Sequence, residues 1–202
     1  MSYFKKEYLD YFTDKENLVV FDIGSYDGYD SRYFREWLPS ARIFAFEASS
    51  KNFRGVVANT QHYNVTPVNI ALSDKVGTIT FNDTFGKYLG SGSILEPTEA
   101  IFTTFVGMDF RPETVETKTI ELFCQENNLK KVDILHMDVQ GAEHLVIKGI
   151  GSFRPKLVFM ETCEYPFYNG AGTFEELHSY MENLGYELVE RMDMDSLFVL
   201  KE

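Results

Sequence analysis

The sequence predicts one α/β domain built on a doubly wound, mostly parallel sheet that ends in an antiparallel hairpin strand. Apolar strand-like runs alternate with helical patterns along most of the chain, which is the pattern of parallel α/β folds. The last two strand-like runs follow each other directly and are joined by the acidic turn Met192-Asp193-Met194-Asp195. No internal repeat or linker divides the 202 residues, so residues 1–202 are treated as a single domain.

The predicted strands are short runs of apolar, β-branched and aromatic residues bounded by turn residues. They lie at residues 19–23, 42–46, 65–70, 78–81, 133–137, 156–160, 186–191 and 196–200. Helical spacing of apolar residues appears between them, at residues 31–37, 50–59, 119–128, 141–149 and 174–184. This alternation gives the order of the elements along the chain.

Capping and helix-breaking residues set the limits of these helices. Pro39 ends the first helix, and Ser50 is expected to cap the second. Gly149 closes the helix that follows the strand at residues 133–137. Thr173 is expected to cap the last helix and Gly185 to terminate it.

Two segments fall outside this alternation. Residues 1–17 show an amphipathic helical pattern, which suits a segment that packs on the domain or covers a site. Residues 82–114 are long and rich in glycine, but they contain apolar residues and a short helical stretch near residue 100. Loops of this length in compact domains usually serve function, so we predict a substrate lid there.

Composition excludes several classes of protein. The formal net charge is −12, from 31 acidic and 19 basic residues, which argues against a nucleic-acid partner because phosphate contacts need lysine and arginine. No apolar run reaches the ~18 residues of a membrane span, and the N-terminus lacks the apolar core of a secretory signal. Cys124 and Cys163 are not spaced as a metal or redox pair, so we expect a cytoplasmic protein.

The first strand leads into a glycine-containing turn. Asp22, Gly24 and Gly28 form the pattern D-x-G-x-x-x-G between this strand and the first helix. Strand, glycine turn and helix together bring backbone close to a nucleotide-like ligand. The spacing differs from the G-x-G-x-x-G of dinucleotide sites and favours a ligand without phosphate that carries an ammonium and a carboxylate, such as S-adenosylmethionine.

Acidic residues follow four of the predicted parallel strands at their carboxyl ends. They are Asp22, Glu47, Asp138 and Glu161. Ligands of open α/β sheets bind outside these strand ends, so we expect the four side chains to meet at one edge of the sheet. Glu47 comes 19 residues after Gly28, which fits an acid that accepts hydrogen bonds from a ribose diol. That feature alone suits NAD equally well.

Four segments of the chain resemble the FkbM family of class I S-adenosylmethionine-dependent methyltransferases. They are residues 21–29 with FDIGSYDGY, residues 46–47 with FE, residues 69–77 with NIALSDKVG, and residues 138–143 with DVQGAE. The resemblance implies a Rossmann-like sheet of seven strands and methyl transfer, usually to an oxygen of a sugar or natural product. It also implies a set of cofactor-binding residues: Asp22, Gly24, Ser25, Tyr26, Asp27, Gly28, Glu47, Ala48, Ala71, Leu72 and Asp138.

The chain departs from the family pattern at four positions. The family commonly has asparagine and an apolar residue at Tyr26 and Asp27, glutamate at Gln140, and lysine at His136. The changes at Tyr26, Asp27 and Gln140 are expected to alter cofactor contacts. The change at His136 affects the proposed chemistry.

An alcohol acceptor must lose its proton as the new bond forms. His136 lies two residues before Asp138, so the two side chains are expected on the same side of the strand, beside the methyl donor. Our hypothesis makes one of them the base and the other its orienting partner; the alternative is a structural histidine in the core. Glu161 joins the candidate catalytic residues, and Asp138, Glu161 and Glu164 offer the oxygen ligands of a magnesium-assisted variant.

Three functions remain open at this point. The leading interpretation is an O-methyltransferase that acts on a hydroxyl of a sugar, a glycan or a glycosylated small molecule. The second is a nicotinamide-dependent oxidoreductase that uses the same turn and Glu47. The third is a degenerate module that binds the cofactor without turnover. The sequence gives no indication of oligomeric state.

Overall fold

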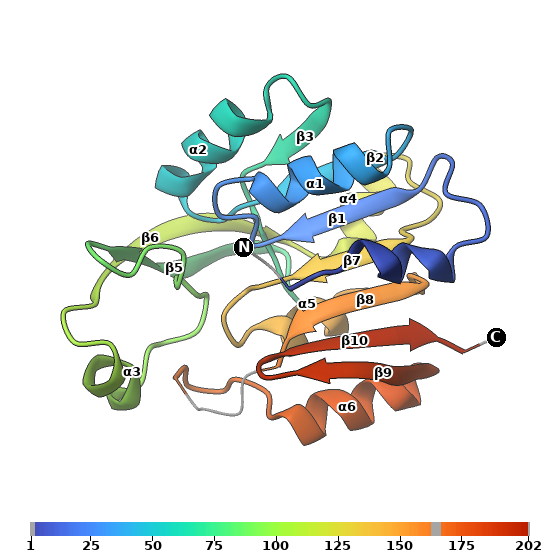
Figure 1. Cartoon of the computed structure of the whole chain (residues 1–202). Coiled ribbons are helices and arrows are strands. Elements are labelled where there is room, and N and C mark those ends of the chain that lie inside the picture. Colours follow the sequence, from blue (N-terminus) through green and yellow to red (C-terminus); the bar gives the residue numbers. More distant parts are fainter. Residues whose placement is uncertain (1–2, 163–166, 202) are drawn as a thin grey trace.

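The computed structural model describes residues 3–162 and 167–201, and its main layer is a sheet of seven strands (Figure 1). These strands are β1 (Val19–Ile23), β2 (Arg42–Phe46), β3 (Val65–Val68), β7 (Ile134–Met137), β8 (Leu157–Glu161), β9 (Tyr186–Met192) and β10 (Asp195–Leu200). Their order is β3-β2-β1-β7-β8-β10-β9, and β10 runs opposite to the other six strands. The predicted fold class is therefore confirmed.

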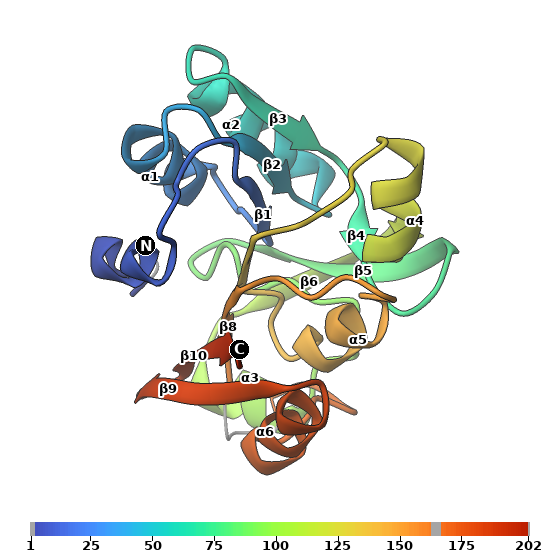
Figure 2. The same ribbon diagram turned by 90° about the vertical axis from the view of Figure 1, so that its right-hand side faces the viewer.

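Helices cover both faces of this sheet. One face carries the 3-10 helix η1 (Lys6–Tyr11), α1 (Tyr29–Trp37) and α2 (Ser50–Thr60), and the other carries α4 (Ile120–Glu126), α5 (Glu143–Lys148) and α6 (Phe174–Asn183). Figure 2 shows η1 and α1 on one side of the strands and α4 and α5 on the other. The sheet is thus the middle of three layers, as the parallel strands require.

Alternation along β1 decides which side chains reach which layer. Val19, Phe21 and Ile23 pack into the core cluster under α4 and α5. Val20 packs on the opposite side with Phe34 of α1. Asp22 shares the parity of Val20 and therefore points toward η1 and α1.

A second sheet of three strands stands beside the main one. It contains β4 (Ala71–Leu72), β5 (Gly77–Phe85) and β6 (Asp109–Lys118), in the order β4-β6-β5. The sequence did not predict β6, and residues 82–85 and 109–114 of the expected irregular segment are in fact strand. β6 contains Pro112 and mostly polar residues, so its pairing with β5 rather than its own pattern makes it a strand.

The connection between β5 and β6, residues 86–108, is the part that remains irregular. It contains the short helix α3 (Glu99–Thr104), close to where the helical stretch was predicted. Figure 1 shows this connection beside the carboxyl ends of the main strands. The segment lies where a lid would have to lie.

Other boundaries differ by a few residues. The strand expected at residues 65–70 ends at Val68 as β3, and β4 follows it as a separate strand. Pro67 is tolerated because β3 is an edge strand. Ser49 caps α2 in place of the expected Ser50, since its side chain accepts a hydrogen bond from the N–H of Asn52. Thr173 caps α6 as predicted, within a full capping box with Glu176.

The N-terminal segment is less helical than its pattern suggests. Among the described residues 3–17, only Lys6–Tyr11 is helical, and no side chain caps its start. Phe4, Tyr8 and Leu9 are nevertheless buried against the η1 and α1 face of the sheet. Tertiary packing rather than helix propensity holds this segment, so it packs on the domain, one of the two expected arrangements.

None of the helices in the described part of the chain is both long and apolar enough to cross a membrane.

Candidate active site

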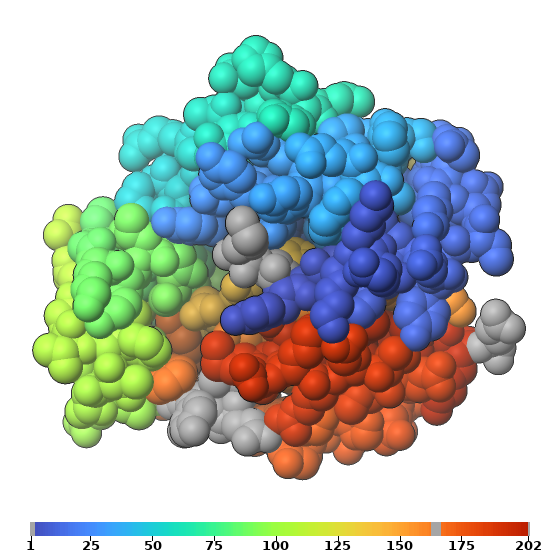
Figure 3. Space-filling view, in the orientation of Figure 1, coloured from blue at the N-terminus to red at the C-terminus, as the bar shows by residue number. Residues whose placement is uncertain are grey.

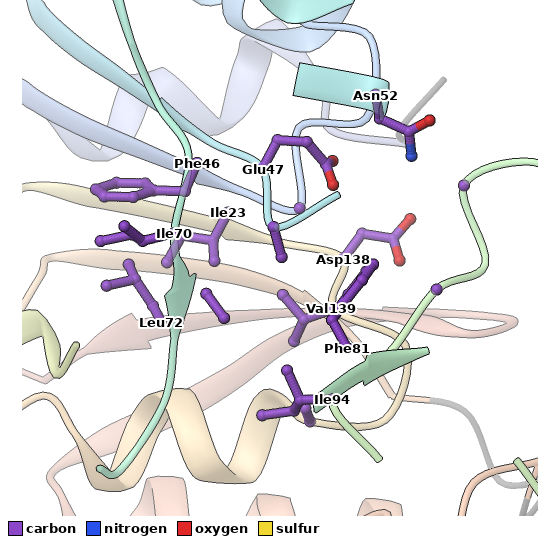
Figure 4. A pocket seen from close by; sticks show the side chains of 16 residues that line it. Ile23, Phe46, Glu47, Asn52, Ile70, Leu72, Phe81, Ile94, Asp138 and Val139 are labelled. Carbon is purple, nitrogen blue, oxygen red and sulfur yellow. The ribbon is translucent and has the colours of Figure 1, made fainter. Parts of the chain in front are cut away.

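Three neighbouring cavities lie at the carboxyl ends of β1, β2 and β7, where the fold places ligands. The inner slot lies between the ends of β1 and β2 and the second sheet, and the sticks in Figure 4 are its lining residues. The outer cleft opens over the β1 turn, and the apolar chamber lies beneath α3. Among the described lining residues, Asp138 alone borders all three cavities.

The inner slot has an apolar side and a polar side. Ile70, Leu72 and Val139 supply the apolar side, and the carboxylates of Glu47 and Asp138 lie on the other (Figure 4). Apolar walls of this kind suit the faces of a purine ring, and an acid suits a ribose diol. The slot's volume of about 40 Å³ means that a nucleoside must displace one wall, and the wall at Gly90, Gly92 and Ile94 lies outside the main sheet.

Glu47 is held in place by backbone. One carboxylate oxygen accepts the N–H of Tyr26 and the other accepts the N–H of Ser49, each at 2.8 Å. Each oxygen keeps a lone pair for a second donor, as recognition of a diol requires. Burial raises the pKa of this carboxyl to about 8, against the opposing effect of the two backbone hydrogen bonds. A pair of ribose hydroxyls is therefore a chemically fitting ligand.

The β1 turn needs glycine for a packing reason. Gly24 has φ of +79°, and a Cβ placed on it would lie 1.9 Å from the backbone oxygen of Asp138. The turns after β1 and β7 thus approach too closely for any side chain at this position. This close approach brings Glu47, Gly24 and Asp138 to one cavity.

The outer cleft is larger and acidic. Its volume is about 510 Å³, and Figure 3 shows a hollow between the blue N-terminal segments, the green connection and the red terminal hairpin. Its acidic lining residues are Asp27, Asp30, Asp138, Glu161, Asp193 and Asp195, and the described residues that line it include no lysine or arginine. Tyr3 also lines this cleft, so the N-terminal segment both packs on the domain and borders a site.

Asp22 and His136 form a buried pair. The Nδ1 of His136 lies 2.8 Å from one carboxylate oxygen of Asp22, and the other oxygen accepts the hydroxyl of Ser31 at 2.5 Å. The His136 ring stacks on Phe159 at an interplanar angle of 8°. Burial lowers the pKa of His136, but the hydrogen bond and charge of Asp22 outweigh it and the net pKa is raised.

This pairing revises two sequence-based expectations. Asp22 does not line any of the three cavities, because alternation along β1 directs it to the α1 side. His136 borders the outer cleft, but the described hydrogen bond of its Nδ1 goes to Asp22 and not to Asp138. His136 is thus both a cleft residue and a partnered core histidine.

Asp138 and Glu161 are linked by Gln140. The side-chain amide of Gln140 donates to Asp138 at 2.7 Å and to Glu161 at 2.8 Å. Burial raises the pKa of Asp138, and burial together with the charge of Asp138 raises the pKa of Glu161 to about 9. Gln140 borders the outer cleft and the chamber rather than the slot, and the expectation that it alters cofactor contacts stays a prediction.

Glu143 completes this group of acids from the first turn of α5. Its side chain is 2 % exposed and accepts the N–H of Val139 at 3.0 Å. Burial raises its pKa to about 8. Its hydrogen bond to the turn that carries Asp138 gives Glu143 a structural role, and it also borders the chamber.

The expected cofactor residues divide between the cavities. Those at the inner slot are Gly24, Glu47, Ala48, Ala71, Leu72 and Asp138. Ser25, Tyr26 and Asp27 border the outer cleft instead. Gly28 lines none of the three cavities. A Cβ at this position would lie 2.8 Å from the side chain of Thr60, so glycine is needed here for close packing against α2.

Two residues that line the slot, Phe81 and Ile94, were not predicted from the sequence. They belong to the segments around β5, whose pairing the sequence did not reveal.

The magnesium hypothesis finds no support here. Within residues 3–162 and 167–201, no group of three or more potential ligand side chains is arranged to hold a metal ion. The amide of Gln140 donates a hydrogen bond to each of the two expected ligands, Asp138 and Glu161. The third expected ligand, Glu164, and the cysteine Cys163 lie outside the described residues.

Sequence comparison places the chain among methyltransferases. The profile described as "Methyltransferase FkbM domain" matches residues 22–188. The 2-O-methyltransferase NoeI of Sinorhizobium fredii is 31% identical over 174 residues, which cover 78% of this chain and 68% of that protein. The methyltransferase sdnD of Sordaria araneosa is 25% identical over 214 residues, which cover 92% of this chain and 81% of that protein.

Solved structures share the fold at low sequence identity. A putative caffeoyl-CoA O-methyltransferase from Staphylococcus aureus matches with a TM-score of 0.51 at 13% identity, over 97% of this chain and 80% of its own. A precorrin-6y C5,15-methyltransferase from Geobacter metallireducens matches with a TM-score of 0.50 at 15% identity, over 96% of this chain and 85% of that protein's chain. These matches show that the fold is shared.

Proposed function

The chain belongs to the FkbM methyltransferase family and is an S-adenosylmethionine-dependent methyltransferase; we propose that its acceptor is a hydroxyl of a sugar, a glycan or a glycosylated natural product. The observation that carries this proposal is the position of Asp138. It borders the inner slot that suits a nucleoside and the outer cleft that is large enough for an acceptor. The family assignment removes the nicotinamide-dependent oxidoreductase from consideration.

The bound cofactor would supply an electrophilic methyl group for in-line displacement by the acceptor oxygen. Glu47 would hold the ribose hydroxyls with its remaining lone pairs, and Ile70, Leu72 and Phe81 would enclose the base. The turn at Gly24 would approach the amino-acid portion, because it borders both the slot and the outer cleft.

Asp138 is our proposed general base. Burial raises its pKa toward the range in which a carboxylate accepts a proton efficiently at neutral pH. Gln140 orients one carboxylate oxygen and links it to Glu161, which burial and the Asp138 charge keep protonated. His136 supports the site through its bond to Asp22 and its position at the cleft.

The charge of the outer cleft narrows the acceptor class. Six carboxyl side chains line it, at residues 27, 30, 138, 161, 193 and 195, and burial raises the pKa of Asp195 to about 6. A phosphate group would be repelled there, whereas neutral hydroxyls pair well with carboxylates. We therefore propose a neutral hydroxyl acceptor rather than a nucleotide-linked sugar. The relative named as a 2-O-methyltransferase supports transfer to oxygen.

We also propose a cytoplasmic location. Cys124 is a buried free thiol, and free thiols are usual in reducing compartments.

Calorimetric titration of S-adenosylhomocysteine, with NADH as control ligand, tests the cofactor assignment. Glu47→Ala should weaken the binding of S-adenosylhomocysteine by about 2–3 kcal/mol, roughly thirty- to more than a hundredfold, because two charge-assisted hydrogen bonds to the ribose are lost. Glu113→Ala is the matched control, since this half-buried carboxylate also accepts a backbone N–H, from Ser50. Binding of NADH without S-adenosylhomocysteine would overturn the proposal.

Asp138→Asn tests the catalytic assignment. With the base removed, turnover on neutral glycosides should fall by about 10²- to 10⁴-fold, measured as S-adenosylhomocysteine formed. The affinity for S-adenosylhomocysteine should stay within a few-fold of the parent enzyme. An active variant would show that another group takes the proton. Cofactor binding by the parent chain without turnover on any acceptor would instead favour the degenerate module.

A further inference from the structure

The apolar chamber beneath α3 has no assigned role in the proposed reaction. Its volume is about 320 Å³, and its apolar lining comes from α3, the segment after it, α6 and the loop before α6. The apolar residues that define it here are Ile101, Phe105, Met108, Phe167, Tyr168 and Leu177. Several of them belong to a separate core cluster that is centred on Ile101, Met108 and Tyr168.

A cavity of this size is unusual inside a core cluster. Protein interiors pack as densely as organic crystals and hold few voids larger than a water molecule. An apolar cavity of ~150 Å³ stays dry and takes up benzene, and this chamber is about twice as large. The chamber opens into the outer cleft, so a ligand can enter it, and its mostly apolar walls favour an apolar occupant.

The chamber is adjacent to the proposed reaction centre. It shares the lining residues Ser91, Asp138, Gln140, Glu161 and Met194 with the outer cleft. One ligand can therefore span both cavities and pass Asp138 at their junction. Its hydroxyl-bearing part would lie among the carboxylates, and its other part among the rings and aliphatic chains of the chamber.

We propose that the chamber binds an apolar group of the acceptor, so that the substrate is amphipathic: a neutral hydroxylated part joined to a ring or alkyl chain. This inference rests on the proposed function and specifies the substrate class of the same site. Two of the three acids that border the chamber agree with it, because burial raises the pKa of Glu143 and Glu161 and keeps them neutral there; the third, Asp138, lies at the junction with the outer cleft. The chamber therefore presents little charge to an apolar guest.

The test titrates methyl, butyl, hexyl and octyl β-D-glucopyranoside, as monomers, into the chain saturated with S-adenosylhomocysteine. Affinity should rise by roughly two- to fourfold for each added methylene until the chamber is full. Equal affinities for the methyl and octyl compounds would overturn the proposal. If S-adenosylhomocysteine does not bind, the proposed function fails, and the same titration of the unloaded chain still tests the chamber.

Variants show whether the chain-length effect arises in the chamber. Met108→Trp and Leu177→Phe narrow it from different segments, and each should abolish the gain from longer chains; two variants keep the test valid if one fails to fold. Phe105→Ala widens the chamber and should move the optimum to a longer chain. Val106→Ala is the matched control, because Val106 is 77% exposed beside Phe105 and does not line the chamber. An equal effect of the control and the narrowing variants would mean non-specific detergent binding and would overturn the proposal.

Discussion

At the scale of single residues, Asp22 serves the site without lining it. Its carboxylate accepts from Ser31 of α1 and pairs with His136 of β7, and so it joins three elements beneath the outer cleft. Asp22 is 1% exposed and His136 is 4% exposed. A buried charged pair of this kind is costly to break, because the remaining partner is left without compensation.

Asp22→Asn should therefore destabilise the fold in a pH-dependent way. The folded-state pKa of His136 is raised above its ordinary value of 6.5, so this pair stabilises fully below pH 6.5 and less as the pH rises through the folded-state pKa. We expect a loss of about 3 kcal/mol in the free energy of unfolding at pH 6 and a smaller loss at pH 9. Urea unfolding at both pH values measures this.

Ser31→Ala is the control for the same carboxylate. It removes the neutral hydroxyl bond to Asp22 and should cost about 1 kcal/mol at either pH. A pH-independent effect of Asp22→Asn would show that His136 stays neutral in the fold.

At the scale of elements, the turns after β1 and β7 depend on each other. Gly24 allows the β1 turn to contact the backbone of Asp138, and the N–H of Asp138 donates to the carbonyl of Ile23 at 3.0 Å. The turn after β7 contains Gln140 at φ of +55° and Gly141 at φ of +90°. These contacts fix the position of Asp138, the proposed base, at the edge of the inner slot.

Gly24→Ala should disrupt this arrangement. The added methyl group meets the Asp138 carbonyl oxygen, so positive-φ strain and overpacking combine to cost about 3 kcal/mol or more in unfolding free energy. Gly107→Ala is the matched control, since Gly107 has φ of +88° but open space around its Cβ position, and it should cost about 1 kcal/mol. Thermal and urea unfolding compare the two variants; equal losses would mean that the turns separate easily.

At the scale of the whole molecule, strand order gathers acidic residues at one edge of the sheet. β1, β2, β7 and β8 are neighbours, and Glu47, Asp138 and Glu161 lie at or just beyond the ends of three of them. Burial is the main cause that raises the pKa of Glu47, Glu143 and Glu161, to about 8, 8 and 9. The unliganded fold thus places several acids where ionisation is unfavourable.

This arrangement predicts that the unliganded chain loses stability as the pH rises from about 5 to 9. Folded-state pKa values above the ordinary 4.5 mean that the folded chain keeps protons that the unfolded chain has released, so each added pH unit in this window favours unfolding. In the variant Glu143→Gln the side chain cannot ionise. Its free energy of unfolding should therefore exceed that of the parent by roughly 2–4 kcal/mol at pH 9 and be close to it at pH 5. Urea unfolding at pH 5, 7 and 9 measures this. Glu187→Gln is the control, because Glu187 of β9 is exposed. Parallel curves for Glu143→Gln and the parent would contradict the assigned role of burial.

Local patterns in the sequence determined most of the main layer and the identity of the cofactor. The alternation of strand and helix patterns predicted the elements of the main sheet, although not where each one begins and ends. The four segments that resemble the family predicted the methyltransferase class, which the comparisons confirm. The glycine turn and Glu47 could be identified because turn chemistry and strand ends depend on residues close together in the chain. Such short-range signals survive in the sequence by themselves.

Only the tertiary structure decided how distant residues meet. β6 becomes a strand because it pairs with β5 and β4, and Asp22 finds its partner in His136, 114 positions along the chain. The apolar chamber likewise forms between α3, α6 and the loop before α6. These features arise from packing between segments far apart in the sequence, and no local pattern of residues encodes them.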